Sequence, residues 1–283
     1  MTDFFILAGG FGKRAMPLTD FLPKPIFPLD GIPLLKIIGQ QLLDSGFKKG
    51  FINIHHLASK ITKCKLNDLK IDYLEENILS GNKILSSVAE LIENDLLVIN
   101  GDTFLEIPIK KLFIELKNSE SDGVILVRKK TEEYPSIVTD NGFYVKRDRD
   151  PNLTDIMYAG VSIFRNGFLH KLQEENFFDS IELSGSKFQV MEYGGPWLDL
   201  GTPKNYFQAN KIFRKMKKKN SGNSISKNVK ITNNVKIENS IIWENTKISG
   251  KSIIKDSIIT GSIHIHNKNF TKKIVTKNGI YNL

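Results

Sequence analysis

A glycine-rich turn followed at once by a proline-rich stretch constrains the fold of this chain more than any other feature. It spans residues 4–35, FFILAGGFGKRAMPLTDFLPKPIFPLDGIPLL. The leading run FFILAG is short and apolar, which is typical of a buried strand. Gly10, Gly12 and Ala15 then match the dinucleotide-binding pattern G-x-G-x-x-G/A. Asp30 lies near the place where an acidic ribose-binding residue would be sought. The first question is whether this turn binds a nicotinamide cofactor or another phosphate.

The prolines argue against a nicotinamide enzyme. A dinucleotide fold needs a helix that begins at the glycine turn, because the helix N-terminus binds the pyrophosphate. Proline inside a helix costs about 3 kcal/mol or more, and the P-loop pattern G-x-x-x-x-G-K-[ST] is absent as well. We therefore expect a tight backbone cradle for phosphate oxygens, with Arg14 and Lys24 as cations on the extended loop that follows. The prolines that interrupt the segment are Pro17, Pro23, Pro25, Pro28 and Pro33.

Strand and helix patterns alternate along the chain up to about residue 215. Such alternation favours right-handed βαβ units and an α/β fold with a mostly parallel sheet. Ligands of such sheets bind at the carboxyl ends of the strands. The expected strands are 4–9, 51–57, 95–101 and 121–129, and the expected helices are 34–45 and 84–92.

The pattern changes after the polar linker 217–224, KKKNSGNS. β-branched residues then recur at multiples of six, with asparagine, glycine and serine between them. This period predicts a hexapeptide β-helix of two or three coils, and the alternative is a pair of hairpins. We expect domains at 1–220 and 221–283, with the short second domain packed on the first or on a partner subunit. The periodic residues are Val229, Val235, Ile241, Ile253, Ile259 and Ile265, while Lys247 with Ile248 beside it breaks the pattern.

Composition narrows the class of protein. The 283 residues include one cysteine, Cys64, so an intrachain disulfide and a thiolate metal cluster are excluded. No apolar run approaches the roughly 20 residues of a membrane helix, and no basic segment precedes the first apolar run. These features predict a cytoplasmic protein without a signal peptide. The net charge of +9 suits polyanionic small molecules, nucleic acid or a membrane. The basic run 214–219 has no interleaved aromatics and is interpreted as a solvated helix end, so no nucleic-acid or membrane partner is expected.

The front loop resembles the signature of the sugar-1-phosphate nucleotidylyltransferases. Residues 7–35 follow the pattern LAGGxGxRxxPLTxxxPKPxxPxxGxPLL, and three later segments are similar to the same family: NGDTF (100–104), MYAGVSIF (157–164) and PWLDLGTPKNYFQAN (196–210). The tail resembles the left-handed β-helix appended to some members. The resemblance implies a Rossmann-like catalytic domain. It also implies a reaction in which a sugar 1-phosphate oxygen attacks the α-phosphorus of a nucleoside triphosphate, forming an NDP-sugar and releasing pyrophosphate.

The resemblance also implies roles for individual residues. Arg14 would bind the β- and γ-phosphates, Lys24 would meet the α-phosphate region, and Asp102 completes the catalytic set. Asp102 and Asp199 are the implied Mg²⁺ ligands, with Glu106 a weaker third candidate. The implied nucleotide-binding residues are Leu7, Ala8, Gly9, Gly10, Gly12, Ser80 and Gly81. The implied sugar-phosphate-binding residues are Asn100, Lys146, Tyr158, Gly160 and Thr202.

Two segments depart from the family pattern. In 76–85, ENILSGNKIL, Asn82 and Lys83 stand where small residues usually pack on the base, so the base is left open. The segment 144–151, YVKRDRDP, replaces the usual E-K-P, whose lysine meets the sugar phosphate. Its substitute is to be sought among Lys146, Arg147 and Arg149.

Several substrates are compatible with these residues. The repeat tail favours GTP with mannose 1-phosphate or heptose 1-phosphate. The alternatives are UTP with N-acetylmuramate 1-phosphate, CTP with choline phosphate, and a non-catalytic regulatory subunit that binds an NDP-sugar. Exposed coil ends in the tail also suggest a homo-oligomer.

Overall fold

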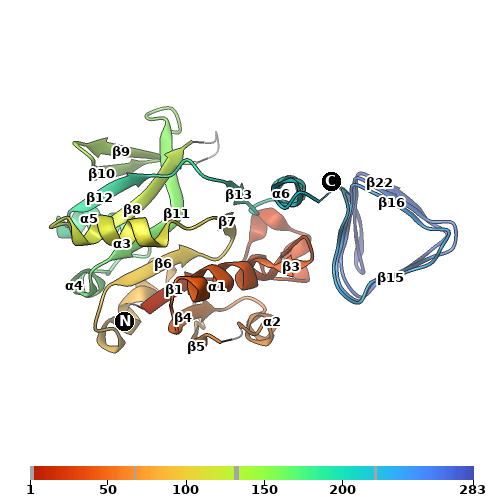
Figure 1. Ribbon diagram of the computed structural model, residues 1–283, viewed down its shortest axis with the longest axis horizontal. Helices are drawn as coiled ribbons and strands as arrows, with labels where there is room; N and C mark the ends of the chain where they lie inside the picture. The colour runs from red at the N-terminus through yellow and green to blue at the C-terminus, as the bar shows by residue number, and fades with distance from the viewer. Residues whose placement is uncertain (1–2, 67, 131–133, 220–221) are drawn as a thin grey trace.

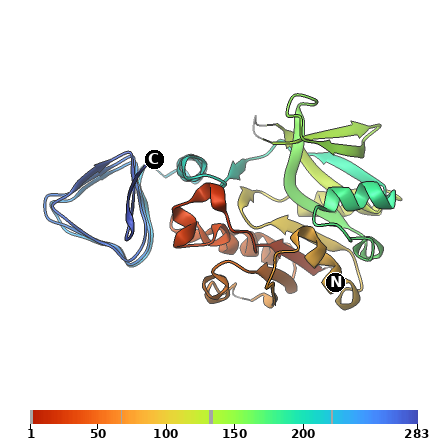
Figure 2. The same ribbon diagram turned by 180° about the vertical axis from the view of Figure 1, so that it is seen from behind.

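The computed structural model describes residues 3–66, 68–130, 134–219 and 222–283. A layered α/β unit lies beside a triangular prism of short strands, and α6 (Pro203–Met216) lies between the two (Figures 1 and 2). The chain ends at the face of the prism that is turned toward α6. No described helix has the length and apolar character needed to cross a bilayer.

A nine-stranded sheet forms the centre of the α/β unit. Only β11 and β10 run antiparallel to their neighbours, and the other adjacent pairs are parallel. The expected mostly parallel, Rossmann-like sheet is therefore confirmed. The strand order is β5 (Lys70–Glu75), β4 (Lys49–Ile54), β1 (Asp3–Leu7), β6 (Leu96–Asn100), β11 (Ile156–Phe164), β8 (Gly123–Lys129), β12 (Phe188–Glu192), β10 (Phe143–Asp148) and β9 (Ser136–Asp140).

Helices cover both faces of the sheet, which explains why β1 is apolar from Phe4 to Leu7. Phe4 and Ile6 belong to one core cluster and Phe5 to the other, because successive strand residues point to opposite faces. The first cluster includes residues of α1 (Leu34–Asp44) and α3 (Ile109–Lys117). The second includes residues of α4 (Asn166–Leu169), α5 (Phe177–Ser184) and a long 3₁₀ helix, η4 (Gly81–Leu91). The helix expected at 84–92 is thus present as a 3₁₀ helix.

The proline-rich loop forms three single turns of 3₁₀ helix. They are η1 (Lys13–Ala15), η2 (Leu18–Asp20) and η3 (Lys24–Ile26), and a two-stranded ribbon of β2 (Pro28–Leu29) and β3 (Ile32–Pro33) follows. A crossover helix begins only at Leu34, after the last proline of the segment. The short helix α2 (Ala58–Lys63) then follows β4. The chain therefore passes the glycine turn without the helix that a dinucleotide fold requires.

The prism is built from three short sheets whose strands pair in parallel from coil to coil, as expected of the left-handed β-helix. This pairing excludes the two hairpins; only the last strand of the chain pairs antiparallel. The sheets are β14 (Ser224–Ile225), β17 (Ile241–Ile242), β20 (Ile258–Ile259), β23 (Lys273–Thr276) and β24 (Gly279–Asn282); β15 (Lys230–Ile231), β18 (Lys247–Ser249) and β21 (His264–His266); and β16 (Lys236–Glu238), β19 (Ile253–Lys255) and β22 (Asn269–Thr271).

The residues buried in the prism core differ from those that a strict six-residue period predicts. Ile241 pairs with Ile258 and Lys230 with Lys247, so each of these coils has 17 residues instead of 18. One corner of each of these coils is a residue shorter than a strict six-residue period requires. The side chain that points into the prism core is therefore that of residue 254 and not that of residue 253. Ile253 is 45% exposed, whereas Ile254 is fully buried. The buried residues of the prism core are Ile242, Ile248, Ile254, Ile259, Ile265 and Val275.

One face of the prism packs against the α/β unit around Trp243. The Trp243 side chain is 1% exposed, and its Nε1 donates to Tyr206 Oη at 3.0 Å. Tyr206 Oη donates in turn to the Pro28 carbonyl oxygen at 2.8 Å. The Phe27 ring lies 5.5 Å from the Trp243 ring, centroid to centroid. These contacts join the proline loop, α6 and the β-helix into a single apolar core.

Asp30 strengthens this junction and does not serve a ribose. Its side chain is 6% exposed and forms ion pairs with Arg214 and with Lys219, the second at 2.6 Å. The Asp30 backbone N–H donates to Asn210 Oδ1 at 2.9 Å. The basic run 214–219 is therefore only partly the solvated helix end that we expected, since Arg214 is buried.

The shifted register predicts which isoleucine stabilises the prism. Ile254→Ala should lower the free energy of unfolding by about 2–5 kcal/mol, because it leaves a cavity in a small core. Ile253→Ala, one residue away but exposed, should change it by less than about 0.5 kcal/mol. Urea unfolding followed by circular dichroism compares the two variants. An equal loss in both would contradict the 17-residue coil.

Candidate active site

The carboxyl ends of β1 and β6 bring the glycine turn and the NGD segment together. The two strands pair in parallel with Leu7 opposite Asn100, and the Gly101 N–H donates to the Leu7 carbonyl oxygen at 2.9 Å. A Cβ at position 101 would lie 2.8 Å from that oxygen, so glycine allows this close approach. The edge of the sheet where ligands were expected therefore carries both predicted segments.

Two adjoining pockets open at this edge, and Asn100 and Asp102 line both. The first, here called the turn pocket, has a volume of about 280 Å³ and the second, the strand pocket, about 190 Å³. The turn pocket is lined by Leu7, Ala8, Gly9, Gly10, Lys24, Pro25, Asn53, Leu79, Gly81, Asn82, Asn100 and Asp102. The strand pocket is lined by Arg14, Asn100, Asp102, Thr103, Tyr134, Pro135, Arg147, Met157, Tyr158, Ala159, Gly160, Trp197 and Asp199.

Lys24 and Asp102 meet where the two pockets join. Lys24 Nζ lies 2.5 Å from Asp102 Oδ2, and the lysine side chain is 12% exposed. Pro23 and Pro25 flank Lys24 in the 3₁₀ turn η3, and proline fixes φ, so the lysine stands on stiff backbone. This rigid support matches what the P-K-P sequence predicted.

Asp199 reaches the same place from a separate two-stranded sheet. β13 (Trp197–Asp199) pairs antiparallel with β7 (Thr103–Leu105), and Asp199 lies opposite Thr103, the neighbour of Asp102. The Asp199 carboxylate accepts from the Gly201 N–H at 2.8 Å and from Asn205 Nδ2 at 2.6 Å. These donors fix its orientation.

Tyr134 forms part of the wall beside Asp199. Burial of the ring, together with the nearby Asp199 carboxylate that its hydroxyl contacts, raises the pKa of Tyr134 well above its usual value. The phenol therefore stays protonated at neutral pH and can donate. Its ring meets the Trp197 ring edge to face at 5.6 Å, and Trp197 Nε1 donates to the Ala159 carbonyl oxygen at 3.0 Å.

The donor set fits a magnesium ion. Within the described residues, no three histidine, cysteine or acidic side chains converge as a metal cluster. Two carboxylates do face the strand pocket, Asp102 and Asp199. Mg²⁺ typically takes one or two protein carboxylates and fills its other positions with phosphate oxygens and water. Glu106, the third candidate, lines neither pocket.

A buried network holds the glycine turn against the segment that follows β5. Asn53 Oδ1 accepts from the Ala8 N–H at 2.7 Å, and Asn53 Nδ2 donates to Glu76 Oε2 at 2.6 Å. Glu76 Oε1 accepts from the Ser80 N–H and from Ser80 Oγ. Asn53 is 4% exposed and Glu76 7%. The spacing of the turn pocket therefore depends on a pair of side chains that motif comparison did not identify.

Gly81 has a backbone that only glycine suits. Its φ is +58°, and a Cβ there would lie 2.3 Å from the Glu175 carbonyl oxygen. Gly12 is similar, with a φ of +65° and a would-be Cβ 2.7 Å from the Thr19 side chain. Both glycines are thus required by close approach as well as by conformation.

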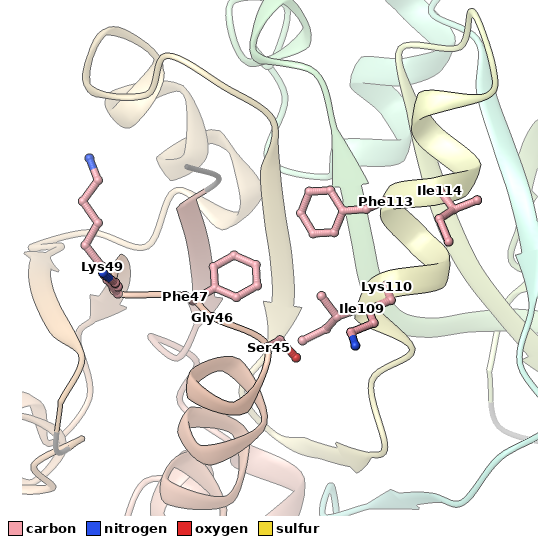
Figure 3. Close-up of a pocket in the computed structure, with 9 residues that line it drawn as sticks. Ser45, Gly46, Phe47, Lys49, Ile109, Lys110, Phe113 and Ile114 are labelled. Carbon is pink, nitrogen blue, oxygen red and sulfur yellow. The ribbon is translucent and has the colours of Figure 1, made fainter.

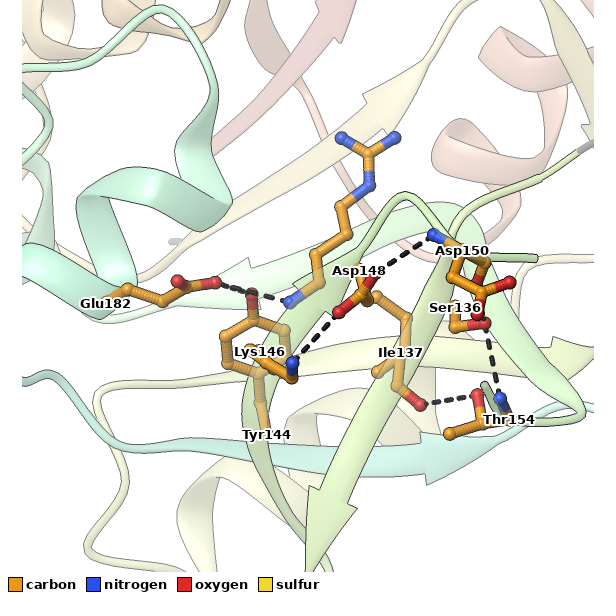
Figure 4. Close-up of polar contacts among 9 residues, drawn as sticks. Ser136, Ile137, Tyr144, Lys146, Asp148, Asp150, Thr154 and Glu182 are labelled. Atoms are coloured by element: carbon orange, nitrogen blue, oxygen red, sulfur yellow. Dashed lines mark hydrogen bonds and ion pairs between the residues drawn. The ribbon is translucent and has the colours of Figure 1, made fainter. Parts of the chain in front are cut away.

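Besides Glu106, four predicted residues lie outside the two pockets. Lys146 Nζ pairs with Asp148 Oδ2 at 2.9 Å on the hairpin of β9 and β10 (Figure 4). Thr202 is the N-cap of α6, where its Oγ1 accepts from the Asn205 N–H at 3.1 Å. Ser80 bonds to Glu76, and Gly12 forms the turn behind the pocket. Arg147, one of the alternatives to Lys146, lines the strand pocket instead.

Sequence reasoning missed Asn53, Tyr134 and Trp197. The available signal for Asn53 was a polar residue inside the apolar strand FINI. Trp197 lies in the family-like segment 196–210, two residues before Asp199, and that position was its available signal. Tyr134 carries no local signal, because only the tertiary fold brings it to the strand pocket.

A larger, apolar cavity of about 460 Å³ lies away from the predicted residues (Figure 3). It opens between the end of α1 and the start of α3, with Phe47 and Phe113 on its walls and lysines at its rim. None of the predicted site residues lines it.

Comparison with known proteins shows the family to which this chain is related. Residues 4–216 match the family model described as Nucleotidyl transferase. A putative mannose-1-phosphate guanyltransferase of Sulfolobus acidocaldarius is 26% identical over 280 residues, covering 92% of this chain and 76% of that protein. The bifunctional protein GlmU of Methanococcus maripaludis is 29% identical over 260 residues, covering 83% of this chain. The chain spans only 60% of the length of that relative.

Other similar proteins match the α/β unit. A D-glycero-alpha-D-manno-heptose 1-phosphate guanylyltransferase of Aneurinibacillus thermoaerophilus is 25% identical over 229 residues, covering 74% of this chain and 97% of that protein. The crystal structure of HddC from Yersinia pseudotuberculosis superposes with a TM-score of 0.64 at 25% identity, covering 75% of this chain and all of that one. A putative glucose-1-phosphate thymidylyltransferase from Bacillus anthracis, with a TM-score of 0.68 at 17% identity, covers 76% of this chain and 96% of its own and shows the fold alone.

The Asn53 network gives a testable prediction. Asn53→Leu keeps the approximate volume but leaves the Ala8 N–H and the Glu76 carboxylate without their partner. We expect a loss of at least about 2 kcal/mol in the free energy of unfolding, because unsatisfied buried groups cost about 1–3 kcal/mol each. Urea unfolding measures it, with Asn118→Leu at an exposed position as the control. A loss no larger than that of the control would show that the network does not stabilise the turn.

Proposed function

Because the chain belongs to the nucleotidyl transferase family, we propose that it transfers a nucleoside monophosphate from a nucleoside triphosphate to a sugar 1-phosphate. The products are an NDP-sugar and pyrophosphate. One observation carries this proposal: Arg14, Lys24, Asp102 and Asp199, from three separate segments, line two pockets that join at Asp102. The adjoining pockets suit two substrates that must meet.

The proposed reaction joins two anionic substrates, a nucleoside triphosphate and a sugar 1-phosphate, which the protein must bring together. In the proposed reaction, an acceptor phosphate oxygen attacks the α-phosphorus and the bond to the pyrophosphate breaks. Such reactions depend on positioning and on fixed positive charge. Lys24, held between two prolines, and Arg14, on the wall of the strand pocket, supply that charge. Asp102 and Asp199 would hold Mg²⁺, which when bound neutralises phosphate charge.

The turn pocket is the proposed nucleotide site and the strand pocket the proposed acceptor site. Arg14 lines the strand pocket and not the turn pocket, so its expected contact with the β- and γ-phosphates requires the triphosphate to extend from the first pocket toward the second. Backbone at Gly9 and Gly10 faces the first pocket, where its close approach suits phosphates. Asn100, Tyr158 and Gly160 line the second, as proposed for sugar-phosphate contacts. Lys146 and Thr202 line neither pocket and both side chains are engaged elsewhere, so neither is part of the proposed acceptor site.

We favour GTP with mannose 1-phosphate or heptose 1-phosphate as the substrate pair. The names of two relatives support this choice, since both are guanylyltransferases of those sugars. UTP with N-acetylmuramate 1-phosphate and CTP with choline phosphate are the alternatives. A regulatory subunit is a second candidate, because Asn82 lines the turn pocket where small residues were expected. Binding of an NDP-sugar without turnover in any assay would support it.

The proposed reaction predicts the effect of losing one carboxylate. In a pyrophosphate-release assay that combines the four common nucleoside triphosphates with a panel of sugar 1-phosphates, we expect Mg²⁺-dependent turnover that EDTA abolishes. Asp102→Asn should lower kcat by at least about 100-fold, because it removes charge from the metal site without changing its volume.

Glu106→Gln is the matched control. This carboxylate lies four residues away but lines neither pocket, so its loss should leave turnover near that of the unaltered protein. Normal turnover in Asp102→Asn would remove Asp102 from the mechanism. Absence of turnover with every pair, in folded protein, would overturn the proposed function.

We also propose a homo-oligomer formed through the C-terminal repeats. The first coil offers strands β14, β15 and β16 at the ends of their sheets, and Ile225 and Ile231 there are each 40% exposed. Size-exclusion chromatography should show a species larger than one chain, and Ile231→Glu should shift it toward the monomer. Elution of the unaltered protein as a monomer at all concentrations would contradict this.

A further inference from the structure

The hairpin of β9 and β10 presents three basic residues, of which one reaches the strand pocket. Lys146 pairs with Asp148 on its own strand, away from the pocket lining (Figure 4). Arg149 does not line the pocket either, whereas Arg147 does. The pairing of β10 with β9 shifts between Tyr144 and Lys146. Such bulges re-aim the side chains that follow them.

Helix α5 holds Arg147 in place from behind. Glu182 Oε1 accepts from the Arg147 backbone N–H at 3.2 Å and from Tyr144 Oη at 2.5 Å. The Arg147 guanidinium lies over the Phe178 ring, 5.2 Å from its centroid. Figure 4 shows Glu182 reaching across to Tyr144. A guanidinium stacked on an aromatic ring loses little entropy on binding, so the group is preorganised.

The charge of Arg147 has no ion-pair partner in the described part of the chain. No carboxylate of the described residues lies within ion-pair distance of its guanidinium, in contrast to Lys146, Lys24 and Arg214. Partial desolvation lowers the pKa of Arg147, which nevertheless remains charged at neutral pH. A fixed cation at a pocket wall without a counter-charge is complementary to an anionic ligand.

We propose that Arg147 binds the phosphate group of the acceptor and so takes the place of the family lysine that this chain lacks. The inference rests on the proposed function and deepens it. The planar fork of the guanidinium can donate two parallel hydrogen bonds to two phosphate oxygens, a geometry that a lysine ammonium does not fix. In this proposal the acceptor phosphate lies between Arg147 and the Asp102 end of the strand pocket.

Steady-state kinetics with the best substrate pair from the panel test this role. Arg147→Ala should raise the KM for the acceptor by about 10- to 100-fold, as expected for the loss of a charge-assisted hydrogen-bond pair. The KM for the nucleotide should change less than about threefold. Arg147→Lys keeps the charge but loses the fork, so it should rescue only part of the acceptor affinity.

Lys146→Ala is the control, since it removes a neighbouring cation that already has a partner. It should leave both KM values near those of the unaltered protein, and thermal unfolding should show that all three variants fold. An unchanged acceptor KM in Arg147→Ala, or a loss found instead in Lys146→Ala, would overturn this inference alone. No turnover by the unaltered protein with any pair would overturn the proposed function, and this inference with it.

Discussion

The parallel pairing of β1 with β6 is the constraint on which the site depends. With Leu7 opposite Asn100, the glycine turn and the NGD segment leave the sheet side by side. The other parts of the site lie around the point where these two segments meet. Lys24 returns from the proline loop to Asp102, and β13 adds Asp199 opposite Thr103. A shift of one residue in the pairing of β1 with β6 would turn the side chains of the shifted strand to the opposite face of the sheet.

The backbone of the glycine turn must be held by contacts with other segments, because a glycine-rich segment has little conformational preference of its own. Asn53 supplies such contacts by joining the Ala8 N–H to the Glu76 carboxylate. The prolines stiffen the loop that follows the glycine turn. This loop forms short 3₁₀ turns where a dinucleotide fold would have a crossover helix. The result is a glycine turn whose backbone is held on both sides while Gly9 and Gly10 line the open turn pocket.

The β-helix is part of the same core. Trp243 closes over Phe27 and Tyr206, so the proline loop is packed between the sheet edge and the first coils. The ion pairs of Asp30 with Arg214 and Lys219 join the same three elements. Removal of the repeats would expose this apolar surface, so the stability of the proline loop depends on the β-helix, which lines neither pocket.

Local patterns and ordered motifs predicted the class of fold, the glycine turn and the two distant carboxylates that line the strand pocket. The expected strands and helices lie within a few residues of those observed, apart from the 3₁₀ geometry of η4. Only the tertiary structure decided that Ile254 faces inward, that Arg147 and not Lys146 lines the pocket, and that Asn53 and Tyr134 belong to the site. These depend on a shortened corner, a bulge and contacts between remote segments. Such features result from packing between elements, and no periodic pattern in the sequence indicates them.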